Sequence, residues 1–285
     1  SPPTWRAACA WRSPGKTANK LKEKTLYLLD MDGTIYNENE IFDGTLEFLE
    51  EIERRGGQYV FITNNSSKSV EDYVQKVRAM GIKAEYENFY TSGQATAMYL
   101  KENYPNQVVY CMGTKSLIKE LREAGIEVVT EVDERAGVVL LGFDTENTSE
   151  KIRNTCIMLG RDVAYLATNP DLVCPVSFGY IPDCGSMSIM LKNATGKEPF
   201  FIGKPEPIMV NCVLKKLNCK REDAVIVGDR LYTDIKTGAN AQVDTICVLS
   251  GEASMEDILQ GEVEPTYIFK SVKEIYEGLT EETEL

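Results

Sequence analysis

Short apolar runs alternate with longer stretches of helical spacing along most of the chain. The runs LYLL at 26–29 and YVFI at 59–62 are apolar at every position, and the stretch 45–55 repeats apolar residues at helical spacing before it stops at Gly56. Strands that alternate with helices predict βαβ units, and runs without polar alternation are typical of parallel strands covered on both faces. The pattern therefore predicts an α/β protein with a mostly parallel sheet. Further apolar runs occupy 108–111, 138–141, 164–167, 200–202, 224–227 and 245–249.

The composition narrows the chemistry that such a fold can perform. The 285 residues suffice for one large domain or two modest ones. No histidine is present, which excludes Ser-His-Asp and Cys-His sites, His-ligated zinc sites and phosphohistidine enzymes. Lys and Arg number 31 against 44 Asp and Glu, and this net charge of −13 argues against nucleic acid as a partner. Acid–base chemistry must therefore come from Asp, Glu, Lys, Tyr or Cys.

The lengths of the apolar runs and the spacing of the cysteines indicate the cellular compartment of the protein. No apolar run approaches the ~18 residues of a membrane helix, so we expect no membrane partner. The eight cysteines are scattered singly, without a C-x-x-C pair, which favours reduced thiols and the cytoplasm. Residues 1–24 differ from the rest, with a net charge of +5, three prolines and no apolar periodicity. We expect residues 1–20 to be a disordered, basic extension outside the fold.

Two carboxylates follow the first predicted strand, in the run Asp30-Met31-Asp32-Gly33-Thr34. Ligands of open α/β sheets bind beyond the carboxyl ends of the strands, which is where Asp30 should lie. Two close carboxylates repel each other, which favours a bound cation or a raised pKa on one of them. One could hold a metal and attack, while the other faces a leaving group. The alternative is a simple Asp-Gly turn, but D-x-D-G-T arises by chance in roughly one such chain in 300.

Polar side chains also follow two later strands. Thr63 and Asn64 come directly after YVFI and offer a hydroxyl and N–H groups that suit a phosphate. Alternatively, the Asn and Ser residues of this run merely cap a helix that starts near Lys68. Lys204 follows the run 200–202 and lies between a glycine and a proline. It is either a positioned cation that neutralises a phosphate and nearby carboxylates, or an exposed loop lysine.

Two further aspartates follow a later apolar run. Asp229 follows the apolar run 224–227 and is separated from it by one glycine. Asp234 lies five residues further on, at the start of a predicted helix. Hard cations such as Mg²⁺ take a few carboxylate oxygens and water, so both residues are candidate metal ligands. For Asp234 the alternative is a helix N-cap. Together we expect an Asp, a Thr, a Lys and an Asp at the ends of four strands of one sheet, as a nucleophile, a phosphate-binding donor, a cation and a metal site, and no histidine is required.

At these residues the sequence resembles the haloacid dehalogenase (HAD) superfamily of phosphatases. Its motifs are matched in chain order by DMDGT, the Thr of FITNN, the Lys of GKPEP and GDRLYTD. The closer resemblance is to subfamily IIA, the NagD-like or p-nitrophenyl phosphatase group, and it covers about residues 25–279. It is carried by FITNNSS, FYTSGQATA, ATNPD, IPDCGS, TGKEPFFIGKPEP and GDRLYTDI.

The resemblance implies a fold of two parts. One is a Rossmann-like HAD core with a parallel sheet, which we expect over residues 21–104 and 196–285. The other is an inserted type-2 α/β cap domain, which we expect over residues 105–195. The long interval between Thr63 and Lys204 is consistent with such an insertion.

The resemblance also implies a two-step phosphoryl transfer with Mg²⁺ as cofactor. Asp30 would attack phosphorus and become an aspartyl phosphate, and Asp32 would protonate the leaving oxygen and then activate water. Mg²⁺ would be held by Asp30, Asp229 and the backbone carbonyl of Asp32, with Asp234 supporting these ligands from outside. The phosphoryl oxygens would be bound by Thr63, Asn64, Asn65 and Lys204.

The substrate is left open by the sequence. The resemblance places the leaving group against the cap loop 169–186, where Cys174, Tyr180, Asp183 and Ser186 are candidate specificity residues or ordinary loop residues. Pyridoxal-phosphate phosphatases of this group have a histidine near the place of Cys174, which puts that substrate in doubt. The expected partner is a small phosphorylated metabolite, such as phosphoglycolate, a sugar phosphate or a nucleotide, with p-nitrophenyl phosphate as artificial substrate.

Other functions and assemblies are not excluded by the residues. A phosphotransferase would use the same intermediate with another acceptor than water. A non-catalytic phospho-Asp signalling or binding protein would also place Asp, Thr and Lys at strand ends, but receiver domains are about half this length. A cap face could mediate a homodimer.

Overall fold

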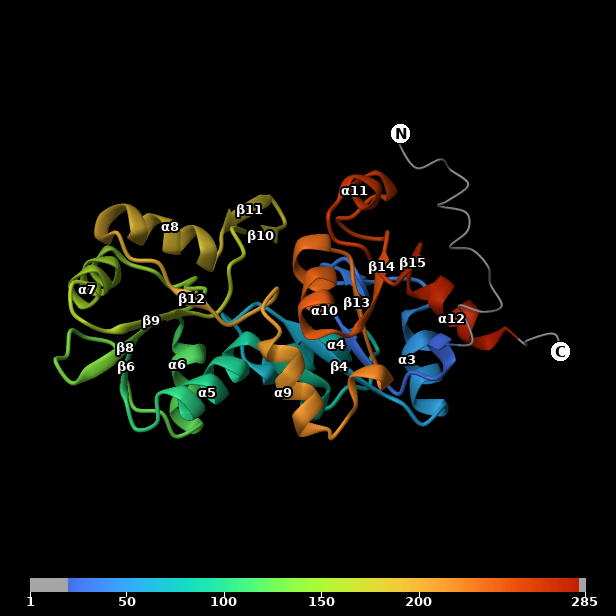
Figure 1. The fold of residues 1–285 in the computed structure, drawn as a ribbon, viewed down its shortest axis with the longest axis horizontal. Coiled ribbons are helices and arrows are strands. Elements are labelled where there is room, and N and C mark those ends of the chain that lie inside the picture. The colour runs from blue at the N-terminus through green and yellow to red at the C-terminus, as the bar shows by residue number, and fades with distance from the viewer. Residues whose placement is uncertain (1–19, 282–285) are drawn as a thin grey trace. The chain divides into compact units, whose positions relative to one another are not determined.

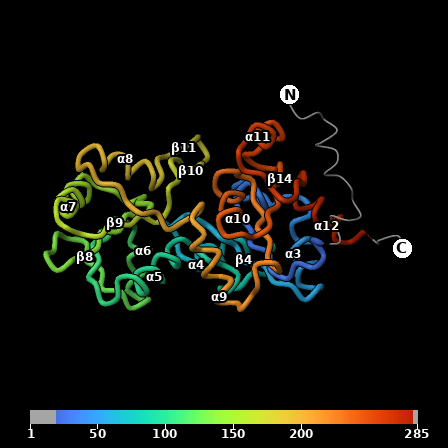
Figure 2. The backbone as a smooth tube through the Cα atoms, viewed as in Figure 1, coloured from blue at the N-terminus to red at the C-terminus, as the bar shows by residue number. Residues whose placement is uncertain are grey.

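The computed structural model describes residues 20–281, in which two compact units are distinguished (Figures 1 and 2). Among these residues, the first unit comprises the chain up to Ile62, Lys76–Asn88 and the chain from Val210 onward. The second comprises Thr63–Gln75 and Phe89–Met209. The predicted basic extension lies outside the described residues, apart from Lys20. The predicted cap boundaries, 105 and 195, stay a prediction.

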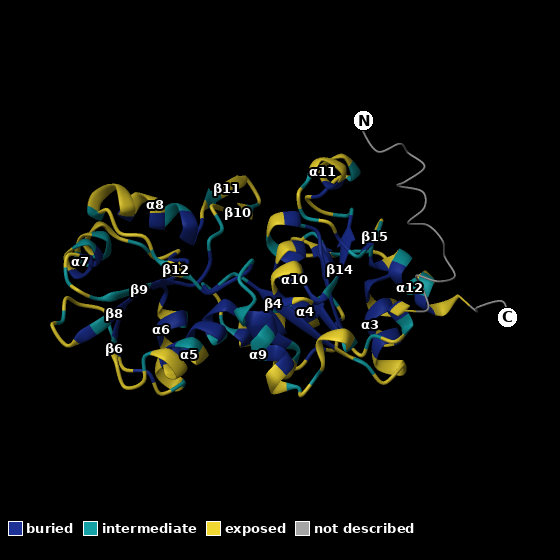
Figure 3. Ribbon diagram, in the orientation of Figure 1, coloured by how far each residue is buried: buried dark blue, intermediate teal, exposed yellow. Residues whose placement is uncertain are grey.

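A parallel sheet contributes most of the core of the first unit. Its strands are β1 (Leu26–Leu29), β4 (Gln58–Thr63), β13 (Ala224–Gly228), β14 (Asp244–Val248) and β15 (Tyr267–Phe269), and the sixth strand of the same sheet is β5 (Phe89–Thr91), whose residues are counted with the second unit. The strand order is β15-β14-β13-β1-β4-β5, and β1 pairs in parallel with both β13 and β4. All residues of β1 are buried, as expected for a strand covered on both faces. Its partner β13 is also buried at every residue, which Figure 3 shows in dark blue.

Helices and turns connect these strands. The helices are α3 (Thr45–Arg54), α10 (Lys236–Ala241), α11 (Met255–Gln260) and α12 (Val272–Thr280), with α4 (Val70–Ala79) and α9 (Ile208–Lys216), which begin in the second unit. The short elements are the hairpin strands β2 (Tyr36–Asn37) and β3 (Glu40–Ile41), the 3₁₀ turns η1 (Tyr86–Asn88) and η2 (Arg221–Asp223), and the π-helical turn η3 (Leu231–Ile235).

The predicted helix at 45–55 is α3. Its apolar spacing buries Phe48 and Ile52, and the helix packs against α12. It begins after Gly44, which has a φ of 81° and lies so close to Lys273 of α12 that a Cβ would be 2.7 Å from the lysine Cα. A side chain at position 44 would therefore be strained in its backbone and would also collide with α12.

The second unit contains a separate parallel sheet. Its order is β12-β9-β8-β6-β7, with β6 (Val108–Met112), β7 (Val128–Val129), β8 (Ala136–Leu141), β9 (Ala164–Ala167) and β12 (Phe200–Phe201). The helices are α5 (Ser92–Asn103), α6 (Lys115–Glu123), α7 (Ser149–Leu159) and α8 (Cys184–Thr195), and an antiparallel hairpin is formed by β10 (Val173–Val176) and β11 (Gly179–Pro182).

Successive residues of β6 pack into different cores. Val109 belongs to a cluster with Leu121 of α6, whereas Tyr110 belongs to a cluster with Met158 of α7 and Leu191 of α8. Because side chains of a strand alternate between faces, the sheet is covered by helices on both sides. This explains why the apolar runs of this unit lack polar alternation.

The strands and the fold class predicted from the sequence are confirmed. Each predicted apolar run overlaps a strand, and the strands of both larger sheets pair in parallel where the register is defined. Within residues 20–281, no helix has the length and hydropathy that crossing a membrane requires.

The carboxylate of Glu120 is partly buried between two helices of the second unit, with its Oε1 enclosed. Thr91 caps α5, where its hydroxyl accepts from Gln94 N at 3.1 Å. Glu120 of α6 packs so close to this end of α5 that a Cβ on Gly93 would lie 2.9 Å from its Oε1. Burial raises the pKa of Glu120 to about 7, although a hydrogen bond with Thr91 acts in the opposite direction. The carboxylate therefore costs stability when it is ionised.

We expect Glu120→Gln to stabilise the protein at alkaline pH. Because the folded-state pKa lies above the unfolded value of 4.5, the folded state binds the extra proton between about pH 4.5 and 7, and wild-type stability falls as pH rises through that window. A shift of one pKa unit corresponds to about 1.36 kcal/mol, so the difference in unfolding free energy between Glu120→Gln and wild type should grow by about 2–3 kcal/mol between pH 5 and 8. Urea unfolding at both pH values measures it, with the exposed Glu123→Gln as control. A pH-independent advantage would contradict the assignment.

Candidate active site

The carboxyl ends of two paired strands carry the first two candidate residues. Asp30 directly follows β1 and Asp229 directly follows β13, and the strands pair in register with Leu29 opposite Val227. Asp30 N donates to Val227 O at 2.9 Å, which extends the ladder by one residue. The two aspartates are therefore placed side by side by the sheet itself.

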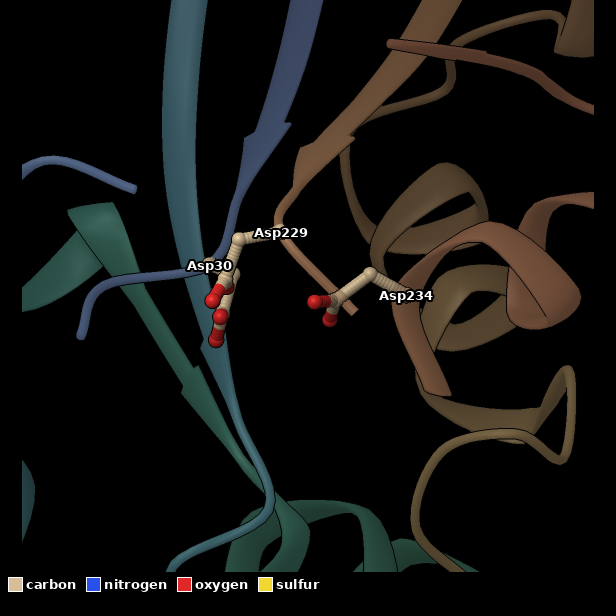
Figure 4. Close-up of side chains that lie close together, drawn as sticks. All are labelled: Asp30, Asp229 and Asp234. Atoms are coloured by element: carbon tan, nitrogen blue, oxygen red, sulfur yellow. The ribbon is translucent and has the colours of Figure 1, made fainter. Parts of the chain in front are cut away.

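A third carboxylate joins them from the turn that follows β13. Oxygen atoms of Asp30, Asp229 and Asp234 all lie within 4.8 Å of one another (Figure 4). Asp234 lies on the π-helical turn η3, a distortion often found at functional sites. Asp229 and Asp234 are 3% and 1% exposed, respectively. Burial and the charges of Asp30 and Asp234 raise the pKa of Asp229 above its usual range.

This donor set fits a hard divalent cation. Carboxylate oxygens are the ligands that Mg²⁺ prefers, and a cation among them would relieve the mutual repulsion that raises the pKa of Asp229. The resemblance implies that Asp234 supports the metal ligands from outside, and its carboxylate lies in the same cluster as those of Asp30 and Asp229. A direct or a water-mediated contact of Asp234 with the metal stays a prediction.

Donors on either side hold the Asp229 carboxylate. The Thr34 hydroxyl donates to its Oδ1 at 3.2 Å, and Glu252 N donates to its Oδ2 at 2.9 Å. Arg230 is paired with Glu252 at 2.9 Å, and although burial disfavours its charge, nearby carboxylates, with Asp30 first among them, raise its pKa. These positions were missed by the sequence analysis, although Thr34 belongs to the D-x-D-G-T run and Arg230 adjoins Asp229.

Two glycines leave the space that the Asp229 side chain fills. A Cβ on Gly33, which has a φ of 84°, would lie 2.4 Å from Asp229 Oδ2, and a Cβ on Gly251 would lie 2.0 Å from the same atom. Both distances are far below van der Waals contact, so any side chain at either position must displace the carboxylate.

Asp32 is exposed and is not one of the three clustered carboxylates. Its Oδ1 accepts from Glu38 N at 3.3 Å, and its backbone bridges to Tyr36 at the start of β2. An exposed carboxylate can exchange protons with solvent, which is compatible with the acid–base role implied by the resemblance. That role stays a prediction.

The candidate phosphate-binding residues are gathered in the second unit. Thr63 ends β4, and its hydroxyl accepts from Asn65 N at 3.1 Å. The Asn65 side chain accepts from Ser67 N and Ser67 Oγ, so it stabilises the loop. The Asn64 side chain binds the backbone of Lys204, with Oδ1 accepting from Lys204 N at 2.8 Å and Nδ2 donating to Lys204 O at 2.9 Å. Any phosphate contact of Asn64 would therefore use its backbone N–H.

Lys204 itself is not an exposed loop lysine. The residue is only 3% exposed. It comes after the end of β12, separated from that strand by Ile202 and Gly203. Two hydrogen bonds hold the Asn64 side chain against the Lys204 backbone. The prediction that all four strands belong to one sheet is wrong, because β12 pairs with β9, whereas β1, β4 and β13 belong to the other parallel sheet. Phosphate binding by these residues stays a prediction.

The four candidate specificity residues lie on or beside the β10–β11 hairpin. Cys174 is in β10 and is half-buried, and Tyr180 is in β11 and is exposed. Asp183 is the N-cap of α8, where its Oδ1 accepts from Cys184 N, and Ser186 Oγ donates to Leu172 O at 2.6 Å. Asp183 and Ser186 therefore have architectural contacts, and a role of any of the four toward substrate stays a prediction.

Comparison with protein-family models finds two matches. Residues 27–127 match a model described as haloacid dehalogenase-like hydrolase, and residues 201–275 match one described as HAD-hydrolase-like. The first match contains Asp30 and Asn64, and the second contains Lys204 and Asp229.

Individual relatives cover nearly the whole chain. An acid sugar phosphatase of Staphylococcus saprophyticus is 36% identical over 259 residues, covering 91% of this chain and 99% of the relative. A 4-nitrophenylphosphatase of Thermotoga maritima is 38% identical, with a TM-score of 0.87, covering 91% of this chain and 99% of that structure. A glycerol phosphate phosphatase of Mycobacterium tuberculosis, solved in complex with magnesium, is 27% identical with a TM-score of 0.84, covering 91% of this chain and 77% of that one. The chain therefore belongs to the haloacid dehalogenase-like hydrolases, and within them to the NagD-like p-nitrophenyl phosphatases of subfamily IIA.

Proposed function

We propose that this protein is a Mg²⁺-dependent phosphatase that hydrolyses small phosphate monoesters through an aspartyl-phosphate intermediate. The observation that carries the proposal is the cluster of Asp30, Asp229 and Asp234 at the carboxyl ends of two paired strands. The names of the relatives support it, since they describe phosphatases of sugar phosphate, 4-nitrophenyl phosphate and glycerol phosphate. The activity is that of a phosphoric monoester hydrolase.

In the first step, a carboxylate oxygen of Asp30 attacks phosphorus and the bond from phosphorus to the leaving oxygen breaks. Asp32 supplies a proton to that oxygen, so that an alcohol or phenol departs. Thr63, the backbone N–H of Asn64 and the Lys204 ammonium would bind the phosphoryl oxygens. Asp30, Asp229 and the backbone carbonyl of Asp32 would hold Mg²⁺ with support from Asp234, and the ion would supply charge neutralisation when bound.

In the second step, water attacks the phosphorus of the aspartyl phosphate. Asp32, now ionised, takes a proton from the water, and the bond between phosphorus and the Asp30 oxygen breaks. Inorganic phosphate leaves and both aspartates return to their starting protonation states. Because the chain supplies no histidine, every proton in this cycle moves on a carboxylate.

The substrate class is a small phosphorylated metabolite, and a sugar phosphate is favoured by the name of the staphylococcal relative. A nucleic-acid substrate is disfavoured by the net charge of −13. The buried thiols Cys111, Cys184 and Cys247 support a reducing compartment, which we propose is the cytoplasm.

Removing divalent metal should abolish the activity. We expect hydrolysis of p-nitrophenyl phosphate at neutral pH to fall at least ~100-fold in excess EDTA and to return when Mg²⁺ is restored, because the clustered carboxylates repel the incoming phosphate without a cation. Circular dichroism of the EDTA-treated protein serves as the control for folding. Undiminished turnover in EDTA would overturn the proposed metal dependence.

A further inference from the structure

The Asn64 side chain connects the Lys204 loop to a second carboxylate. Besides its two hydrogen bonds to the Lys204 backbone, Asn64 Nδ2 donates to Asp171 Oδ2 at 2.8 Å. One amide group therefore fixes Lys204 on one side and is itself oriented by Asp171 on the other. If the amide rotated by half a turn, its oxygen would face both Asp171 and Lys204 O, which are acceptors.

Asp171 also receives a donor from the opposite direction. Asn169 Nδ2 donates to the same Asp171 Oδ2 at 2.7 Å and to Asp183 Oδ1 at 2.9 Å. Asn169 is fully buried, and its Oδ1 accepts from the Thr168 hydroxyl at 2.9 Å. A carboxylate suits this place because it only accepts, so a single oxygen can satisfy two amide donors without presenting a hydrogen to either.

The backbone at Asp171 is tied to the base of the β10–β11 hairpin. Gly185 N donates to Asp171 O at 2.8 Å, and Asp183 N donates to Leu172 O at 3.0 Å, immediately before β10 begins. A Cβ on Gly185 would lie 2.1 Å from Pro170 O, so this approach of α8 requires glycine. Figure 1 shows the hairpin next to the beginning of α8.

We propose that Asp171 is a positioning residue, which holds the Lys204 backbone through Asn64 and joins it to the hairpin that carries Cys174 and Tyr180. This inference rests on the proposed function, in which Lys204 binds the phosphoryl group. Asp171 touches no reacting atom in this account. Its effect on phosphate binding passes through Asn64, so an acceptor oxygen at position 171 is required and a negative charge is not.

The test compares Asp171→Ala with Asp171→Asn. Both are assayed for kcat and KM with p-nitrophenyl phosphate and Mg²⁺, and for the Kd of inorganic phosphate by calorimetry. We expect Asp171→Ala to weaken phosphate binding and raise KM by about 10- to 30-fold, since an orienting hydrogen bond to Asn64 is lost. Asp171→Asn should remain within about threefold of wild type, because its amide oxygen can accept from both asparagines. The exposed Asp162→Ala is the control for loss of a carboxylate in this unit.

A double-mutant cycle with Asn64→Ala separates positioning from a merely structural effect. If Asp171 acts through Asn64, Asp171→Ala should add little to the loss of phosphate affinity in the Asn64→Ala background. Additive losses would overturn the inference, and so would an Asp171→Asn variant as impaired as Asp171→Ala, or an Asp171→Ala variant that binds phosphate like wild type. If Asp171→Ala does not fold, Asp171→Ser enters the cycle in its place.

The calorimetric measurement keeps this inference distinct from the proposed function. A wild-type protein that binds inorganic phosphate but hydrolyses no monoester would refute the phosphatase proposal, whereas the variants would still report on Asp171. An active wild type with unaltered phosphate binding in Asp171→Ala would refute the positioning role alone.

Discussion

Asp30→Asn should reduce kcat for p-nitrophenyl phosphate by about 10⁴-fold or more, which corresponds to ~5 kcal/mol of activation free energy. The amide cannot attack phosphorus, and it also replaces one of three clustered oxygen donors by a weaker ligand. The fold should persist, because the substitution is isosteric and relieves repulsion with Asp229. Steady-state kinetics with thermal unfolding as a companion measurement check both statements.

The matched control for Asp30→Asn is Asp43→Asn. Asp43 is an exposed carboxylate of the same unit, paired with Lys273 at 2.9 Å, and this change should leave kcat within about twofold because exposed ion pairs contribute little. An Asp30→Asn enzyme with more than a hundredth of wild-type activity would exclude Asp30 as the nucleophile.

Asp32→Asn distinguishes the two proposed roles. p-Nitrophenolate is a weakly basic leaving group that departs without a proton, so the first step should survive, while attack by water should slow. The variant should therefore release a burst of p-nitrophenol and accumulate phosphate on Asp30, detectable by mass spectrometry of the intact protein. Absence of both signals would place Asp32 outside the second step.

Gly251→Ala should be nearly as damaging as loss of a site carboxylate, with kcat/KM lowered by about 100-fold or more. The new Cβ would lie 2.0 Å from Asp229 Oδ2, and the carboxylate cannot retreat without leaving Thr34 and Glu252 N. The Mg²⁺ concentration needed for half-maximal activity should rise as well, because Asp229 is displaced from Asp30 and Asp234. Kinetics over a Mg²⁺ titration measure both effects.

Gly278→Ala is the control for Gly251→Ala. Gly278 lies in α12, where the nearest atom to a Cβ would be 3.8 Å away, so alanine should be tolerated and should favour the helix by up to about 1 kcal/mol. A Gly251→Ala enzyme that needs no additional Mg²⁺ would show that the space beside Asp229 is not required for the metal site.

The parallel strands and their terminal residues were predictable because they obey local rules. LYLL and YVFI are apolar at every position, and burial on both faces produces this pattern regardless of which strands become neighbours. The proximity of Asp30 and Asp229 could be predicted from these strands, since residues at the carboxyl ends of parallel strands lie at the same edge of the sheet. The helix at 45–55 followed from periodicity alone.

Other features depend on contacts that the sequence does not display. The β10–β11 hairpin contains two prolines and exposed aromatic residues, such as Phe178 with 80% exposure, and shows no alternation that would predict strands. The contacts of Asn64 with Lys204 and Asp171 join residues more than a hundred positions apart. The sequence left Asp234 open between a residue of the metal site and a helix N-cap, because its place in the cluster depends on a π-helical turn that the spacing does not display.

The pairing of β1 with β13 has a consequence for synthesis on the ribosome. Leu28 pairs with Val60 of β4 on one side and with Ile226 of β13 on the other, so β1 waits for roughly 200 further residues before this second partner is translated. The strands of the second unit, from β6 to β12, all emerge within that interval and can pair first. Until β13 appears, β1 has an unpaired apolar edge, which makes this stage of translation the one most exposed to aggregation and to chaperone capture.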